Sequence, residues 1–161
     1  MTLHLEEARL NCSRAVIPRG VAHFRLPGPA TTREFAFLAL PRFTLLAFSS
    51  AIEPLRIANQ LTQQPLYRWS LVSMDGKPVE SSAGVRIEVD HSLVPLGRDT
   101  TVVVCSGTDA SHAADRGVLN WLRNHARQGG GIGAICTGAY TLARAGLLGE
   151  DAPAVHWENQ P

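Results

Sequence analysis

One cysteine, Cys136, lies where a short apolar strand is predicted to turn into a helix. The segment 129–140 reads GGGIGAICTGAY, with Ala134 two residues before the cysteine and Gly138 two residues after it. Small residues at these positions leave room for a strand to turn sharply into a helix, as in a nucleophile elbow. The thiol would lie over the first turn of a helix predicted over 137–145, whose unpaired amides and dipole favour a thiolate. A small buried hydrophobic residue is an equally good interpretation of a free cysteine.

The composition is that of a single soluble globular domain. The chain has 161 residues, of which 45% are hydrophobic and 18% are charged, and its formal net charge is +1. A charge so close to zero, with scattered arginines, argues against binding nucleic acid by bulk electrostatics. No apolar run approaches the about 18 residues of a membrane-spanning helix, and the charged N-terminal residues do not fit a signal peptide. We therefore expect a cytoplasmic protein that does not contact a membrane.

The three cysteines, Cys12, Cys105 and Cys136, are an odd number without CxxC spacing. This pattern fits neither a disulfide framework nor a zinc site, and it is typical of a reducing cytoplasm. We therefore expect no metal and no cofactor. Cys105 ends an apolar run and is expected in the core.

The first half of the chain predicts a leader followed by strand, helix and strand. Residues 1–32 lack clear periodicity and are expected to be a leader, partly ordered at best, before a domain over 33–161. The apolar run at 34–40 predicts a strand covered on both faces. A helix should begin near residue 51, because Ser49 and Ser50 are good N-caps and Pro54 fits only a first turn.

The remaining chain continues the alternation of strands and helices. Strands are predicted over 67–73 and 100–105, and alternation at Val85, Ile87 and Val89 predicts a half-exposed strand. A helix over 113–127 precedes the strand and helix around Cys136, and one more strand is expected at 154–158. This order predicts a doubly wound, mostly parallel α/β sheet with helices on both faces. Ligands in such sheets bind beyond the carboxyl ends of the strands.

Three segments in the right order resemble one known superfamily. Residues 43–55 (FTLLAFSSAIEPL), 102–107 (VVVCSG) and 133–148 (GAICTGAYTLARAGLL) are similar to ThiJ/PfpI proteins, which have a flavodoxin-like, class I glutamine amidotransferase-like fold. More narrowly, CTGA followed by VHWE resembles the sensor domain of GlxA-type regulators of the AraC family. The resemblance covers roughly 33–161.

The resemblance implies partners as well as a fold. In GlxA-type regulators a C-terminal AraC-type domain with two helix-turn-helix units follows the sensor domain, and nothing similar is present in this chain. We therefore expect a fragment of such a regulator, in which DNA is contacted only through the missing domain. A homodimer is the default expectation for the superfamily.

The resemblance also assigns residues to a site at the elbow. Cys136 corresponds to the superfamily cysteine, Gly107 and the Thr137 amide to oxyanion-type donors, and His156 to a histidine found near the cysteine in several members. The enzymes commonly have a carboxylate where this chain has Ala47. Protease-like members have a histidine where this chain has Thr137. Members with a catalytic triad have an acidic residue where this chain has Trp157, directly after His156.

These departures predict a receptor and not an enzyme. Loss of a general acid or base typically lowers a rate 10²–10⁴-fold; if there is catalysis, it would use Cys136, His156 and Glu53. Backbone donors near Ser106 and Gly107 suit a carboxylate, and Trp157 could form an apolar or cation-binding wall. A small zwitterion such as a betaine, carnitine or an amino acid would fit, as the resemblance implies. The predicted ligand-binding residues are Cys136, Thr137, Gly138, Ser106, Gly107, Thr108, Ala47, His156 and Trp157.

Several alternatives remain open from the sequence. The elbow cysteine also fits a cysteine-dependent enzyme, such as a hydratase, a glyoxalase-like enzyme or an amidohydrolase. A dimerisation domain with a vestigial pocket is a third interpretation. Trp157 could be a core or interface aromatic and His156 a structural residue, while His91, His112 and His125 are expected to be solvated.

Overall fold

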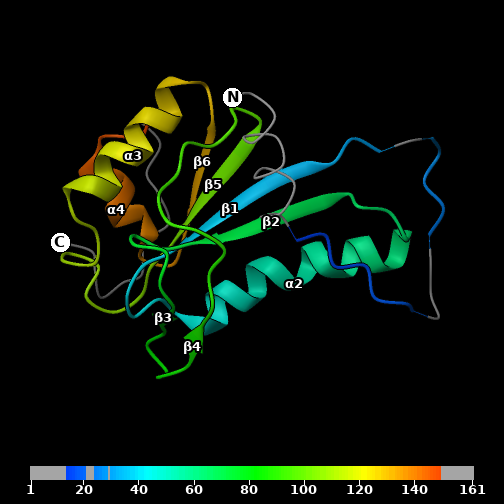
Figure 1. Cartoon of the computed structure of the whole chain (residues 1–161), viewed down its shortest axis with the longest axis horizontal. Helices are drawn as coiled ribbons and strands as arrows, with labels where there is room; N and C mark the ends of the chain where they lie inside the picture. Colours follow the sequence, from blue (N-terminus) through cyan, green and yellow to red (C-terminus); the bar gives the residue numbers. More distant parts are fainter. Residues whose placement is uncertain (1–13, 21–23, 29, 150–161) are drawn as a thin grey trace.

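The computed structural model describes residues 14–20, 24–28 and 30–149, whose arrangement is shown in Figure 1. The predicted strand at 154–158, with His156 and Trp157, and Cys12 in the leader lie outside the described residues. The elements are β1 (Arg33–Ala39), α2 (Leu45–Thr62), β2 (Tyr67–Val72), β3 (Val79–Glu80), β4 (Arg86–Ile87), β5 (Thr100–Cys105), α3 (Arg116–Arg127), β6 (Gly131–Ile135) and α4 (Gly138–Ala145).

A parallel sheet in the order β2-β1-β5-β6 forms the centre of the fold. Helix α2 packs on one face, and α3 and α4 pack on the other, as Figure 1 shows. In the middle strand β1, Leu38 is paired with Val72 on one side and Val104 on the other. The strands therefore end at nearly the same level, and the loops that follow them meet at one edge. The predicted doubly wound sheet is confirmed.

Helix α2 begins earlier than the sequence predicted. It starts at Leu45, not near residue 51, and Pro54 lies inside its 18 residues. The proline removes one backbone hydrogen bond, whose acceptor would be the Ser50 carbonyl. Ser50 and Pro54 are both exposed, so water can donate a hydrogen bond to the Ser50 carbonyl. On the opposite face of the helix, Phe48 is buried against the sheet. None of the helices in the described part of the chain has the length and apolar composition needed to cross a membrane.

Two other elements are shorter than predicted. Helix α3 begins at Arg116 and not at 113, because Asp115 caps it by accepting a hydrogen bond from the Val118 amide at 2.9 Å. The predicted strand at Val85, Ile87 and Val89 is reduced to β4, which pairs only with the two residues of β3.

The described part of the leader contacts the edge strand β2. Arg14 forms an antiparallel bridge with Trp69, and its guanidinium pairs with Asp90 at 2.8 Å. Gln63 donates a hydrogen bond to the Pro18 carbonyl at 3.2 Å. The division of the chain at residue 32 stays a prediction.

The expectation of solvated histidines was wrong for His125. Its side chain is only 4% exposed, and Nε2 lies 2.9 Å from the Thr100 carbonyl oxygen at the start of β5. The helical spacing that places Leu122 on the sheet also places His125 there, three residues later. His91 is half-buried, and His112 is exposed as expected.

Candidate functional site

The elbow at Cys136 is formed as the sequence predicted. Cys136 has a φ of 53°, in the left-handed region that residues with a side chain rarely adopt. A Cβ added to Gly138 would lie 2.3 Å from the Val104 carbonyl oxygen and 3.2 Å from the Ala134 Cβ. Only glycine therefore lets α4 approach β5 this closely, and the close approach fixes the sharp turn that presents the thiol.

A threonine that sequence reasoning missed contacts the thiol. The Thr44 Oγ1 lies 3.4 Å from the Cys136 Sγ. Thr44 occupies the N-cap position of α2, but its hydroxyl makes no capping hydrogen bond and is free to face the sulfur. The only sequence signal for Thr44 is that threonine is a good N-cap residue, and a helix start near residue 51 does not use it.

The loops after β5 and β6 are joined directly. The buried Thr137 Oγ1 donates a hydrogen bond of 2.6 Å to the Gly107 carbonyl oxygen. Gly107 also forms an antiparallel bridge with Phe43, in the loop after β1. A Cβ on Gly107 would lie 2.3 Å from the Arg42 carbonyl oxygen, so the glycine is required for the loops to approach. Three loops therefore meet beside Cys136.

The structure brings together most of the described residues predicted to bind a ligand. Ser106 and Gly107 are buried directly after β5, and the Gly107 carbonyl accepts the hydrogen bond from Thr137. The Ser106 hydroxyl has no hydrogen-bond partner among the described residues. It is an unused polar group at this edge of the sheet. Whether these residues bind a ligand stays a prediction.

The two positions that bear on catalysis are on α2. Ala47 is half-buried in the first turn of the helix and has no titratable group. Glu53 lies on the exposed face, and its carboxylate forms an ion pair with Arg56 at 2.8 Å. The carboxylate of Glu53 is therefore bound by its neighbour on the same helix.

Strained backbone is concentrated around these loops. In the part of the chain that is described, four non-glycine residues have positive φ, and three of them are Arg42 at 61°, Asp109 at 66° and Cys136 at 53°. They lie in the loops that follow β1, β5 and β6. Such residues persist only where the surroundings hold them, and they are common at ligand sites.

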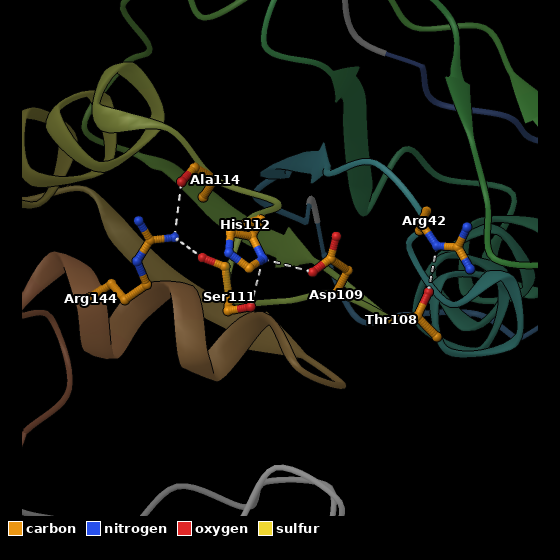
Figure 2. A network of polar contacts seen from close by, with 7 residues as sticks. All are labelled: Arg42, Thr108, Asp109, Ser111, His112, Ala114 and Arg144. Carbon is orange, nitrogen blue, oxygen red and sulfur yellow. Dashed lines mark hydrogen bonds and ion pairs between the residues drawn. The ribbon is translucent and has the colours of Figure 1, made fainter.

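Polar contacts hold the loop after β5 on both sides, as Figure 2 shows. Arg42 Nε donates to the Thr108 hydroxyl at 2.9 Å. From α4, Arg144 Nη1 donates to the carbonyl oxygens of Ser111 at 2.8 Å and Ala114 at 2.9 Å. The loop is therefore fastened to the β1–α2 loop and to the helix that follows Cys136.

The two described cysteines have different environments. Cys105 is 1% exposed, and burial raises the pKa of its thiol well above the usual range. Its expected place in the core is confirmed. Cys136 is only partly buried. Among the described residues, no group of three histidine, cysteine or acidic side chains is placed to hold a metal ion.

Comparison with known proteins agrees with this geometry. Residues 47–160 match the DJ-1/PfpI family. The chain is 42% identical over 132 residues to the HTH-type transcriptional regulator GbdR of Pseudomonas aeruginosa, covering 82% of this chain and 36% of that protein. It is 37% identical over 131 residues to the HTH-type transcriptional regulator GlxA of Rhizobium meliloti, covering 80% and 40% respectively. The chain thus spans well under half the length of these relatives.

A solved structure has the same arrangement of elements. The crystal structure of an AraC family transcriptional regulator from Pseudomonas putida superposes with a TM-score of 0.67 at 25% identity, covering 80% of this chain and 69% of that one. The resemblance inferred from the three sequence segments is therefore confirmed.

Proposed function

The chain belongs to the DJ-1/PfpI family, and we propose that it is the N-terminal ligand-sensing and dimerisation domain of an AraC-family transcriptional regulator. The proposal depends above all on the 42% identity to GbdR over 82% of this chain. A small zwitterionic or amino-acid-like metabolite is the effector that we propose.

The effector site is the edge of the sheet beside Cys136. Its described walls are the loops that carry Thr44, Gly107 and Thr137, which contact one another directly. The first amides of a helix have no carbonyl partner within it, so the α4 amides that precede Tyr140, whose own amide donates to the Thr137 carbonyl, can donate to an anionic group. The half-buried thiol of Cys136 supplies a polarisable surface that can contact the rest of the ligand.

A sensor accounts for this site better than an enzyme does. The hydroxyl of Thr44 faces the sulfur, and a hydroxyl cannot serve as a proton acceptor near neutral pH as a carboxylate can. Ala47 has no group to transfer a proton, and Glu53 is engaged by Arg56. The family fold supplies a preformed site, but Thr44 and Ala47 supply no group beside the cysteine that could transfer a proton.

DNA binding belongs to a part of the regulator that this chain does not include. The chain covers 36% of GbdR and 40% of GlxA, both of which are HTH-type regulators by name. We propose that the chain contributes effector binding and homodimerisation in the cytoplasm, and that another domain contacts the operator.

A thermal-shift screen of the 161-residue chain against small zwitterions and amino acids tests the proposal. An effector at about 100 times its Kd should stabilise the fold by about 2.7 kcal/mol and raise Tm. Cys136→Met, which extends a larger side chain beside Thr44, should lose this response. Ser50→Met, on the exposed face of α2, should keep it. A panel in which no compound raises Tm contradicts the proposal.

The strained elbow favours one alternative, a cysteine-dependent enzyme. The φ of 53° at Cys136 is the geometry that presents a nucleophile in other folds. That function requires turnover of an isonitrile, an α-oxoaldehyde or an amide that is lost in Cys136→Ser. Absence of turnover with all three substrate classes eliminates it.

A further inference from the structure

Arg42 lies in the loop between β1 and α2, on a backbone that is held from two sides. Its amide donates to the Glu80 carbonyl oxygen at 2.9 Å, and its own carbonyl packs against Gly107. Its φ of 61° is held by these contacts. The side chain therefore starts from one defined position.

The guanidinium of Arg42 is hydrogen-bonded but has no ion-pair partner among the described residues. Nε donates to the Thr108 hydroxyl at 2.9 Å, which constrains the direction of the Nε–H bond (Figure 2). Among the described residues, no carboxylate lies within ion-pair distance of it, and its two Nη groups have no acceptor. Arg56 differs, because its guanidinium is paired with Glu53 at 2.8 Å. Within residues 14–20, 24–28 and 30–149, the edge of Arg42 formed by its two Nη groups therefore has no partner and offers two parallel N–H donors.

Both ends of this contact belong to the loops that form the site. Arg42 is two residues before Thr44, which faces the Cys136 sulfur. Thr108 directly follows Gly107, whose carbonyl accepts the Thr137 hydroxyl. The Arg42–Thr108 contact therefore connects the β1–α2 loop and the loop after β5 where both approach the elbow.

We propose that Arg42 is the specificity-determining residue that selects a carboxylate on the effector, with Thr108 holding the guanidinium in place. This inference rests on the proposed function. The two oxygens of a carboxylate match the edge of a guanidinium in a planar, bidentate pair. A phosphate can bind the same edge, so the test must distinguish the two anions.

Calorimetric titration of the 161-residue chain with three probes tests the proposal. The probes are trimethylglycine, its primary amide, in which a neutral carboxamide replaces the carboxylate, and phosphocholine; all three have a trimethylammonium group. The wild type should bind the carboxylate about tenfold more tightly than the amide, the size of one charge-assisted contact. Arg42→Asn should remove this preference without loss of fold, because asparagine tolerates positive φ. Raising the salt from about 20 to about 300 mM should weaken carboxylate binding by the wild type only.

Two further variants separate geometry from charge. Arg42→Lys keeps the charge but loses the planar edge, and it should recover less than half of the preference. Arg33→Asn removes an exposed arginine at the opposite end of β1 and should leave binding unchanged.

Each contrary outcome has a distinct meaning. If Arg42→Asn retains the preference for the carboxylate, the inference is wrong while the proposed function stands. Tighter, Arg42-dependent binding of phosphocholine also overturns it, in favour of a phosphate ligand. If the wild type binds none of the probes and no compound in the thermal-shift panel, both the inference and the proposed function fall.

Discussion

The Thr44 hydroxyl lies 3.4 Å from the Cys136 sulfur, although the two residues are 92 positions apart in the chain. This contact places the loop after the first strand against the elbow that follows the last described strand. It puts a neutral hydrogen-bonding group beside the thiol.

Replacement of Thr44 by valine should slow alkylation of Cys136. The hydroxyl can donate to the sulfur and stabilise the thiolate, which is the reacting form. We expect the rate with iodoacetamide to fall about threefold to tenfold, as for the loss of one hydrogen bond of about 1 kcal/mol. Peptide mass spectrometry measures labelling at Cys136, and Cys136→Ser, which lacks the thiol, is the negative control. An unchanged rate would show that the hydroxyl does not act on the sulfur.

Gly138→Ala should destabilise the protein. The added Cβ would lie 2.3 Å from the Val104 carbonyl oxygen, so α4 must move away from β5. We expect the free energy of unfolding to fall by at least about 2 kcal/mol in urea denaturation. Gly149→Ala is the matched control, because a Cβ there meets no atom of the described residues within 4 Å. Equal stabilities for the two variants would contradict the predicted steric conflict.

Asn59→Ala should also destabilise the fold. The fully buried Asn59 donates to the Tyr67 carbonyl at 2.8 Å and accepts from the Tyr67 amide at 3.0 Å, which holds α2 against β2. Its removal leaves two backbone groups without partners, for a loss of about 2–3 kcal/mol. Ser50→Ala, exposed on the same helix, should stay within about 0.5 kcal/mol of the wild type. Melting curves that coincide for the two variants would refute this role.

The Cys105 thiol should make stability fall at alkaline pH. Burial raises its pKa in the folded state, so above about pH 8.5 the unfolded chain releases a proton that the folded chain retains. The wild type should lose up to about 1.4 kcal/mol per pH unit relative to Cys105→Ala. Below this pH the difference between the two proteins should be constant. Parallel stability profiles from pH 8 to about pH 10.5 would contradict the prediction.

Local patterns in the sequence predicted the strands and the elbow because those features depend on neighbouring residues. The apolar runs of β1 and β5 indicate strands covered on both faces, and both have helices on either side. Small residues around Cys136 indicate a sharp turn, and Gly138 is needed there for steric reasons.

Other features could not be predicted because they depend on tertiary packing. The contact between Thr44 and Cys136 joins two loops that no local pattern relates. Burial of Phe48 extended α2 toward its N-terminus and overrode the signal from Pro54. The left-handed conformation of Arg42 has no marker in its residue type, since glycine or asparagine usually indicates one.

The hydrogen bond from Thr137 to Gly107 spans 30 residues of sequence and joins the loops that follow the paired strands β5 and β6. Contacts of such separation form late, because the entropy of loop closure must be overcome first. A partly folded chain without this pairing would therefore lack the hydrogen bond that joins two loops of the proposed site. In the proposed regulator, a copy whose sheet is incomplete would therefore not respond to the effector.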